Sequence, residues 1–457
     1  MSAGLVLSPA HRGFADSGES IVLRLRGTEP LARIPANFMG LGYEMSSAAT
    51  QGLLNAENSS YVQLLRGLGP KGVLRIGGIV ADFTRYEPDG PGASEPKNTV
   101  ITRAALAQMR DFLKATGWTT IWSLNFGKGS LKKAIAEARD VAKILGLHLE
   151  AVELGNEVEN YGKGRFPLRK ADYSYEDYRA EYVSWHTAIL QAIPGLRFAA
   201  PDTAASVEWV ERMAEDAKGD VQLLTTHYYR GGQRQGTLDQ LMQPDPALKL
   251  KLERLAQVTR KSNIPWRMCE TNSFFGGGRP GISDTFAGAL WVLDYMLLLA
   301  QYGCAGVNIE SGVNQLGFES LYSPIRDDSK GPVIAGIPYY GMLAFASATS
   351  NGLEVLPVEF DNQGVNLTAY VLGRRGHART VVVVNRDSAR DARISFEELG
   401  IRGTTALRLS SPSISSNMGV TFGGAAVDIT GQWKATHVEH VPHGNIFVPH
   451  MSAVVLR

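Results

Sequence analysis

The fold is decided by two apolar runs, VLRIG (73–77) and TTIWSLN (119–125), and by the segment between them. Residues 104–115 of that segment carry apolar side chains at helical spacing. An apolar strand, then a helix, then another apolar strand is typical of a parallel sheet that is buried on both faces. The stretch therefore predicts a strand–helix–strand unit.

The same alternation extends from about residue 36 to residue 345 and provides eight strand-like runs. The other six are FMGLGYE (38–44), LEAVELG (149–155), RFAAP (197–201), QLLTTH (222–227), PWRMCE (265–270) and GVNIE (306–310). Eight strand–helix units over about 300 residues predict a (β/α)8 TIM barrel of the α/β class. A doubly wound open sheet is the alternative, because periodicity alone does not show that a sheet closes.

The two ends of the chain differ in pattern from the middle. Residues 346–457 contain short strands with turn residues and almost no helical period, which predicts a C-terminal β-sandwich. The strand SIVLRLRG (20–27) precedes the barrel and is expected to join that sandwich. We therefore predict an N-terminal segment (1–35), a barrel (36–345) and an appended β-sandwich domain (346–457) that is built from both chain ends.

The composition excludes several classes of protein. Of the 457 residues, 44% are hydrophobic and 20% are charged, which excludes a disordered chain. The 46 basic and 45 acidic residues leave a net charge of +1, so a globally basic nucleic-acid binder is not expected. Cys269 and Cys304 are too few for a disulfide framework and lack metal-ligand spacing, so we expect no metal and no organic cofactor.

The sequence shows no signal for a membrane. No apolar stretch reaches about 18 residues, so no membrane span is expected. The N-terminus, MSAGLVLSPAHRGFADSG (1–18), lacks the basic region and the long apolar region of a signal peptide. Export after removal of a signal peptide is compatible with this sequence, so the localisation is left open.

Two runs of the predicted barrel end in a glutamate, Glu157 after the fourth and Glu270 in the seventh. The carboxyl ends of barrel strands form the active site, and strands four and seven can face each other across its mouth. Two opposed carboxyl groups are the machinery of glycoside hydrolysis. From the residues alone, two solvated or ion-paired glutamates explain the pattern equally well.

An ordered set of motifs resembles the family 79 glycoside hydrolases, which are β-glucuronidases and heparanases. These motifs are LRIGG (74–78), ELGNEVEN (153–160), AAPDTA (199–204), THYYRGG (226–232), CETNSFFGGGRPGISDTFAGALW (269–291) and LYSPI (321–325). The resemblance extends from about residue 36 to the C-terminus. It implies a retaining mechanism, a (β/α)8 barrel and a β-sandwich built from both chain ends.

The resemblance also implies roles for individual residues. Glu157 is similar to the general acid/base and Glu270 to the nucleophile, and a retaining pair of this kind lies about 5–5.5 Å apart. Asn156 is similar to the residue whose amide contacts the sugar 2-hydroxyl, with a turn-stabilising role as the alternative. Tyr228 resembles the tyrosine that hydrogen-bonds the nucleophile, although the neighbouring Tyr229 could hold that role instead.

Three further side chains lie at the predicted strand ends. For Glu44, the resemblance implies binding of distal sugar hydroxyls, and a salt bridge to Arg75 is the competing interpretation. His227 is expected to be structural rather than a proton carrier. Cys269 is expected to pack on the opposite side of its strand from Glu270, because neighbouring side chains alternate.

The loop after the seventh strand is a candidate for binding the C6 carboxylate of a glucuronide. In Gly276, Gly277 and Gly278 the backbone N–H groups can cradle an anion, although a glycine-rich loop can equally be a flexible turn. The loop resembles the heparanase form, and Tyr322 is similar to the family tyrosine that completes the contact. The exo-acting branch has Tyr-Gln where this chain has Phe275 and Gly276, which leaves more of the binding to the glycine amides and Tyr322.

Basic residues are expected on the same rim. They are Lys163, Arg165, Arg169, Lys170, Arg230, Arg234 and Arg279. Arginine forks bind sulfate and carboxylate, so a sulfated glycosaminoglycan is the expected partner, with scattered solvated charges as the alternative. Residues 79–100 form a shorter loop than the pocket-closing insertion of the exo branch, which favours internal cleavage of a polymer.

The resemblance therefore favours a heparanase-like endo-β-glucuronidase that acts on heparan sulfate or a related uronic-acid polymer, without a nucleic-acid partner. An exo-β-glucuronidase that releases terminal glucuronic acid is the nearest alternative. An inactive carbohydrate-binding barrel would leave the pair Glu157 and Glu270 unexplained. A phosphate-binding barrel enzyme would use the glycine triplet but lacks a lysine or metal set.

Overall fold

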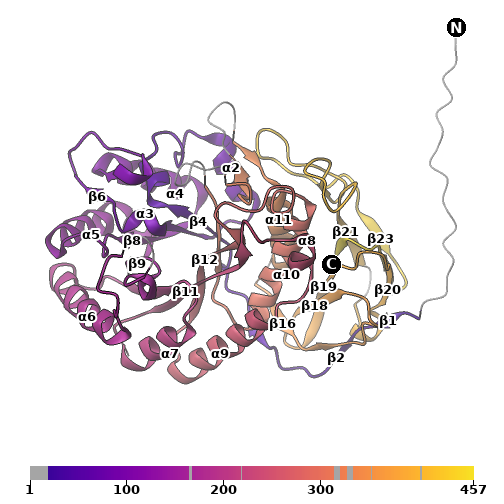
Figure 1. Cartoon of the computed structure of the whole chain (residues 1–457). Helices are drawn as coiled ribbons and strands as arrows, with labels where there is room; N and C mark the ends of the chain where they lie inside the picture. The colour runs from indigo at the N-terminus through magenta and orange to yellow at the C-terminus, as the bar shows by residue number, and fades with distance from the viewer. Residues whose placement is uncertain are drawn as a thin grey trace, which may run out of the picture.

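The computed structural model describes residues 19–163, 167–217, 219–312, 320–326, 333–350, 352–401 and 404–457. Eight parallel strands close into a barrel in the ring order β4-β5-β8-β9-β10-β11-β12-β13 (Figure 1). These strands are β4 Gly40–Glu44, β5 Val73–Gly77, β8 Thr119–Leu124, β9 Leu149–Leu154, β10 Phe198–Thr203, β11 Leu223–Gly232, β12 Trp266–Phe275 and β13 Val307–Glu310. Each predicted run overlaps one of them, so the predicted TIM barrel is confirmed and the open sheet is excluded.

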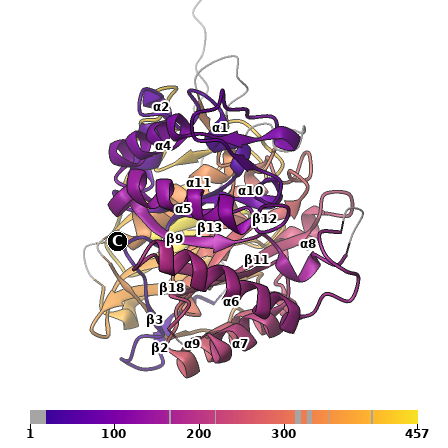
Figure 2. The ribbon, with the colours of Figure 1, turned by 90° about the vertical axis from the view of Figure 1, so that its left-hand side faces the viewer.

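Helices cover the outside of the barrel, and Figure 2 shows α5, α6, α7 and α9 on one side of it. The long helices are α2 Ser59–Gly67, α4 Arg103–Thr116, α5 Leu131–Leu145, α6 Tyr175–Ala192, α7 Val207–Asp216, α9 Pro246–Ser262, α10 Phe286–Gln301 and α11 Ile337–Thr349. The short ones are α1 Met45–Ala49, α3 Gly78–Ala81 and α8 Leu238–Met242. Thr102, Ser130 and Ser174 cap α4, α5 and α6 by accepting a first-turn N–H. No helix in the described parts of the chain is both long and apolar enough to cross a membrane.

A large antiparallel sheet lies beside the barrel, in the order β22-β21-β25-β19-β18-β16-β3, with β23 paired to β21. Its strands are β3 Ala32–Arg33, β16 Glu354–Leu356, β18 Leu367–Arg374, β19 His377–Asn385, β21 Thr404–Ser410, β22 Thr421–Phe422, β23 Glu439–Val441 and β25 Ser452–Leu456. A smaller sheet joins β1 Ile21–Val22, β20 Ala392–Ser395 and β24 Asn445–Val448. The short pairs are β2 Arg24–Leu25 with β17 Val358–Glu359, β6 Arg85–Tyr86 with β7 Val100–Ile101, and β14 Ile325–Arg326 with β15 Ile334–Ala335.

The sheets outside the barrel combine both ends of the chain. The N-terminal strands β1, β2 and β3 pair with the C-terminal strands β20, β17 and β16. The appended sheets are therefore part of the fold as the sequence predicts. The domain limits after residues 35 and 345 stay predictions.

Helices α10 and α11 lie between the barrel and the large sheet (Figure 1). Nearly all of α10 is buried, because the barrel covers one side of it and the sheet covers the other. Strand β19 is apolar on both faces: Val381 and Val383 pack toward the small sheet, and Val382 and Val384 toward the helices. The barrel and the large sheet thus share one continuous apolar core.

One buried carboxylate on α10 also links the barrel to the sheet. Asp294 pairs with Arg386 at 3.0 Å and accepts a hydrogen bond from the Tyr370 hydroxyl at 2.9 Å. A charge in such a buried position needs partners, because its removal from water is costly. The sheet strands supply these partners, so the polar contact helps to fix how the sheet sits on the barrel.

Candidate active site

Glu157 and Glu270 lie together at the carboxyl ends of β9 and β12. One carboxylate oxygen of each and one ring nitrogen of His227 all lie within 4.8 Å of one another. The side chain of Glu157 is 33% exposed and that of Glu270 is 13% exposed. The two glutamates that the sequence singles out are therefore brought to one place, and a ligand can reach them.

A β-bulge on β12 aims Glu270 into the mouth of the barrel. Thr226 and His227 are consecutive on β11, but their partners on β12 are Met268 and Glu270, which leaves Cys269 as an extra residue. The Cys269 thiol packs inside the barrel, within 4.8 Å of two buried carboxylates. The expectation that Cys269 lies on the opposite side of the strand is wrong, because the bulge interrupts the alternation.

Both carboxylate oxygens of Glu270 accept hydrogen bonds. Arg75 donates from Nη1 to Oε2 at 2.9 Å, and the Tyr229 hydroxyl donates to Oε1 at 2.9 Å. Two donors on two oxygens match an ionised carboxylate, which can only accept. They also hold the side chain in a single orientation.

Arg75 connects Glu270 to three groups on β9 and β10 or their ends. Its guanidinium donates to Glu153 at 3.1 Å, to Asn156 Oδ1 at 2.7 Å and to Asp202 at 2.5 Å. The Arg75 side chain is fully buried. Its charge is therefore balanced by this set of carboxylates rather than by solvent.

His227 lies between Asp202 and Glu157. Its Nε2 is 2.9 Å from Asp202 Oδ1, and its Nδ1 is 3.3 Å from Glu157 Oε1. Burial alone would lower the pKa of His227, but the carboxylates of Asp202 and Glu270 raise this pKa well above its usual range. Burial would raise the pKa of Asp202, but Arg75 and His227 lower it. The ring is therefore an imidazolium, which donates from both nitrogens.

The backbone at the site is held in an unfavourable conformation. Glu157 and Asp202 have φ angles of 50° and 58°, and the Glu157 N–H donates to the Asp202 carbonyl at 2.8 Å. Residues with a Cβ seldom adopt this left-handed region, and such strain gathers at functional sites. Gly155, at φ 86°, leads into the turn, where a Cβ would lie 2.1 Å from the Tyr161 hydroxyl.

Tyr229, not Tyr228, reaches Glu270. The Tyr228 hydroxyl donates instead to Asp245 at 2.6 Å, and its ring stacks on Tyr295 of α10. Successive side chains of a strand point to opposite faces, so Tyr228 faces the surrounding helices while Tyr229 faces the mouth. The contact expected of Tyr228 is therefore made by Tyr229, the alternative that the sequence left open.

Asn156 is buried beside the glutamate pair. Its Oδ1 accepts from Arg75, and its backbone N–H donates to Asp82 at 3.3 Å. Because arginine can only donate, the amide oxygen must face Arg75, and the NH2 group is left for a ligand. The predicted contact with a sugar hydroxyl stays a prediction, and the orientation of the amide suits it.

Glu44 lies buried at the end of β4. Its carboxylate accepts from the Val80 N–H at 2.9 Å. The competing interpretation, an ion pair with Arg75, is not found among the described residues, where Arg75 binds the carboxylates of the network. Burial, together with the charges of Glu270 and Glu157, raises the pKa of Glu44 to about 8. The side chain is therefore protonated near neutral pH.

The glycine turn and Tyr322 are neighbours, as the proposed carboxylate pocket requires. Gly276, Gly277 and Gly278 have φ angles of 89°, 92° and 92°, a region that glycine adopts readily. The Tyr322 N–H donates to the Gly277 carbonyl at 3.4 Å, and the Tyr322 ring stacks on Tyr229 at 6.4 Å between centroids. Neither the Gly276 N–H nor the Gly277 N–H donates to another described residue. The arrangement is compatible with the predicted anion cradle, which stays a prediction.

The predicted basic rim is smaller than the sequence suggests. Three members are ion-paired: Arg169 with Glu181 at 2.8 Å, Lys170 with Asp177 at 3.1 Å and Arg230 with Asp245 at 3.2 Å. Lys163, Arg234 and Arg279 form no ion pair with a carboxylate in the parts of the chain that the structure describes, and Arg165 lies outside them. Local carboxylates thus balance three of the six described residues, and the attraction of a sulfated polymer to this rim stays a prediction.

The ion network beneath the glutamate pair is not predicted from the sequence. Arg75, Glu153 and Asp202 each interrupt an apolar strand run, and a charge inside a buried strand must have a partner. This signal could have indicated a buried network. It does not indicate which carboxylates the arginine binds.

No family model matches the chain. The chain is similar to a β-glucuronidase of Aspergillus niger, with 26% identity over 364 residues that cover 70% of this chain and 66% of that protein. It is similar to a β-glucuronidase of Neurospora crassa (25% over 320 residues, 61% of this chain and 56% of that protein) and to heparanase of Mus musculus (23% over 362 residues, 66% of each). The chain thus spans less than two thirds of these relatives. The predicted resemblance to β-glucuronidases and heparanases is confirmed at low identity.

Solved structures confirm the predicted fold. A 4-O-α-L-rhamnosyl-β-D-glucuronidase from Fusarium oxysporum matches with a TM-score of 0.77 and 18% identity, over 95% of this chain and 99% of that one. A family 51 arabinofuranosidase from Xanthomonas axonopodis matches with a TM-score of 0.65 and 14% identity, over 96% and 99% of the two chains. At these identities the likeness concerns the arrangement of barrel and sheets.

Glu44→Gln is expected to remove a pH dependence of stability. A glutamate in the unfolded chain ionises near its ordinary pKa of 4.5, whereas folded Glu44 keeps its proton to about pH 8. Between these values the unfolded state binds fewer protons, so the wild-type stability falls as the pH rises. Urea unfolding at about pH 5 and about pH 9 should show a smaller loss in the variant, by a few kcal/mol. Glu57→Gln, at an exposed position, is the control, and a loss equal to that of the wild type in Glu44→Gln would contradict a buried neutral carboxyl.

Proposed function

We propose that this relative of the family 79 glycoside hydrolases is a retaining glycosidase that hydrolyses linkages of β-D-glucuronic acid. The observation that carries the proposal is the spacing of Glu157 and Glu270, whose nearest described carboxylate oxygens lie within 4.8 Å. Retaining pairs are about 5–5.5 Å apart, whereas inverting pairs are about 6.5–9.5 Å apart to leave room for a water. The short spacing supports a double displacement through a covalent intermediate.

In the first step Glu270 is the nucleophile and Glu157 is the acid. Arg75 and Tyr229 orient the Glu270 carboxylate, which forms a bond to C1 as the bond to the leaving oxygen breaks. Glu157 gives its proton to that oxygen. The surroundings suit this division, because Glu157 is more exposed and contacts His227 rather than Arg75.

In the second step Glu157 acts as the base. The negative charge of Glu270 is gone once it carries the sugar, and Glu157, now a carboxylate, takes a proton from the incoming water. The water oxygen bonds to C1 and Glu270 leaves as a carboxylate. His227 lies 3.3 Å from Glu157 as an imidazolium, so it stabilises the carboxylate form between the steps.

The substrate carboxylate is recognised by backbone amides rather than by a cation. The N–H groups of Gly276 and Gly277 and the hydroxyl of Tyr322 form this cradle. Glu44, being protonated, can donate to a sugar hydroxyl without placing another negative charge beside an anionic substrate. Asn156 donates to the 2-hydroxyl, a contact that strengthens in the transition state.

For the polymer, we propose heparanase-like internal cleavage of heparan sulfate or a related glycosaminoglycan. Phe275 supports this, because it is 57% exposed at the rim and packs edge-on against Tyr229, where it can carry the next sugar ring. Exo-cleavage of terminal glucuronic acid is the second candidate. The ion pairs of Arg169 and Arg230 favour it, because they leave fewer free cations for sulfate.

The two glutamates should fail in different ways on an aryl glucuronide. Glu270→Gln should lose activity on the order of 10³-fold or more, because an amide cannot attack C1. Glu157→Gln should still form the intermediate from an activated leaving group but should hydrolyse it slowly. Stopped-flow traces should therefore show a burst of released aryl group followed by a slow phase, and azide should speed up the slow phase. Glu57→Gln serves as a control at an exposed glutamate. Unchanged hydrolysis by Glu270→Gln would overturn the mechanism.

The two adjacent tyrosines provide a matched pair of variants. Tyr229→Phe removes the hydrogen bond to Glu270 and should lower kcat by about 10- to 100-fold, the value of one hydrogen bond to a charged group. Tyr228→Phe removes a shorter hydrogen bond, of 2.6 Å, to Asp245 on the outer face and should change kcat little. Steady-state kinetics decide this point, and equal losses in the two variants would count against Tyr229 as the group that orients the nucleophile.

A defined heparan sulfate octasaccharide separates internal from terminal cleavage. Internal cleavage should release shorter oligosaccharides from the start of the reaction, as seen by mass spectrometry of the products. Release of free glucuronic acid alone would reject internal cleavage and leave the exo-β-glucuronidase. Absence of products from both this substrate and aryl glucuronides would favour the inactive carbohydrate-binding barrel.

A further inference from the structure

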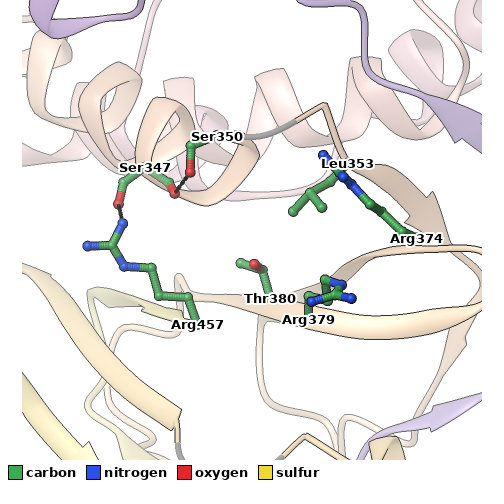
Figure 3. Close-up of a pocket in the computed structure, with 7 residues that line it drawn as sticks. All are labelled: Ser347, Ser350, Leu353, Arg374, Arg379, Thr380 and Arg457. Carbon is green, nitrogen blue, oxygen red and sulfur yellow. Dashed lines mark hydrogen bonds between the residues drawn. The ribbon is translucent and has the colours of Figure 1, made fainter.

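A groove lies between the end of α11 and the hairpin of β18 and β19 (Figure 3). It encloses about 430 Å³ and is lined chiefly by Ser347, Ser350, Arg374, Arg379, Thr380 and Arg457. Arg457 reaches across it and donates to the Ser347 hydroxyl at 3.0 Å. We call this space the arginine groove.

The arginine groove continues into a second cleft of about 640 Å³ that shares Arg374 and Arg379. This cleft adds Arg33, Arg375 and His377, and Glu354 is the acidic residue in its lining. No arginine of the two clefts forms an ion pair with a carboxylate of the described chain; these residues are Arg33, Arg374, Arg375, Arg379 and Arg457. Unbalanced like charges around a concave surface create a positive potential that attracts anions.

The hairpin that carries Arg374, Arg375 and Arg379 has an unfavourable backbone conformation. Arg375 and Gly376 form its two-residue turn with φ angles of 51° and 76°, and such turns prefer Asn, Asp or Gly at both positions. Arg379 is the extra residue of a β-bulge, because consecutive residues of β18 pair with Thr380 and Ala378. A strained arginine and a bulged arginine point to a function of their side chains, because strain of this kind is retained at functional sites.

The lining fits a polysaccharide that carries anionic groups. Arginine forks bind carboxylate and sulfate with two parallel hydrogen bonds, and the serine hydroxyls can bind sugar hydroxyls. A third cleft of about 570 Å³ shares Ser347, Ser350 and Arg457 and adds apolar surface that includes Trp433. Charged and apolar surfaces side by side match a sugar ring with an acidic substituent. Nucleic acid would require a series of aromatic platforms, and a lipid surface would require exposed apolar side chains.

The arginine groove lies at the other end of the barrel from the glutamate pair. Helix α11 begins after the segment that follows the eighth barrel strand and ends beside the groove. Residues between 34 and 39, which lead into the amino end of β4, line the adjoining third cleft. A ligand in the groove therefore does not occupy the mouth of the barrel.

We propose that the arginine groove is a second binding site, which holds an acidic polysaccharide through its carboxylate or sulfate groups independently of the active site. The shared chemistry is a planar or tetrahedral oxyanion on a sugar ring. Held at this site, the polymer keeps the protein on its surface while the mouth of the barrel stays open. The proposal goes beyond the proposed hydrolysis, and a failure of either one leaves the other standing.

The test is calorimetric titration in a Glu270→Gln background, so that no probe is cleaved. The probes are octasaccharides of hyaluronan, which carries only carboxylates, and of chondroitin sulfate, which carries both groups. Arg374→Ser/Arg379→Ser should weaken one binding event at least about tenfold and lower its dependence on salt. Arg139→Ser/Arg260→Ser, which removes two exposed arginines of α5 and α9, should titrate as the parent does. Binding of both probes would assign carboxylate as sufficient, and binding of chondroitin sulfate alone would assign sulfate.

A second variant guards against loss of folding. Arg375→Asn places a residue suited to the left-handed turn, so its melting temperature should equal or exceed that of the parent while its affinity falls. The proposal is overturned if the groove variants and the control pair titrate alike. It is also overturned if a single-stranded oligonucleotide of equal charge binds the groove as tightly as the octasaccharides do.

Discussion

The site depends on the guanidinium of Arg75, which is fully buried. It lies on β5 and joins Glu153 of β9, Asp202 of β10 and Glu270 of β12. Burying an arginine costs several kcal/mol unless carboxylates surround it, and the same carboxylates would repel one another without the arginine. The positions of these strands at the barrel mouth and the orientation of Glu270 therefore have one common cause. The bulge at Cys269 belongs to it, because it brings Glu270 within 2.9 Å of the arginine.

The same charges explain why two glutamates so close together can have different surroundings. The cations are Arg75 and His227, and the carboxylates they contact most closely are Asp202 and Glu270. Glu157 shares only the histidine and is open to solvent on one side. In the proposed mechanism, a sugar on Glu270 removes a negative charge from this group, and the positive charges of Arg75 and His227 can then stabilise a carboxylate on Glu157. The retaining mechanism that we propose needs one group to act first as acid and then as base, and this arrangement of fixed charges suits it.

The barrel could be predicted from the sequence because its strands are buried on both faces and appear as continuous apolar runs. The proximity of Glu157 and Glu270 could be predicted because the carboxyl ends of barrel strands meet at one mouth. The details that set the chemistry follow from geometry that periodicity does not encode. Strand alternation assigns Tyr229 rather than Tyr228 to the mouth, but the bulge on the adjacent strand β12 breaks the same rule at Cys269. The sequence does not show which of the basic loop residues are ion-paired, because their carboxylate partners are distant in sequence or on the next helix.

The two anion sites that we propose lie in different surroundings, and electrostatics gives a reason for the difference. The dipoles of Gly276 and Gly277 can attract the C6 carboxylate without adding a mobile charge beside Glu270, whose oxygens already accept from Arg75 and Tyr229. The far end of α11 lies away from the proposed nucleophile, so free arginines there do not disturb it. Their side chains bind oxyanions more strongly than backbone amides do. We thus propose that anions are bound by backbone amides next to the reacting groups and by arginine side chains far from them, at the other end of the barrel.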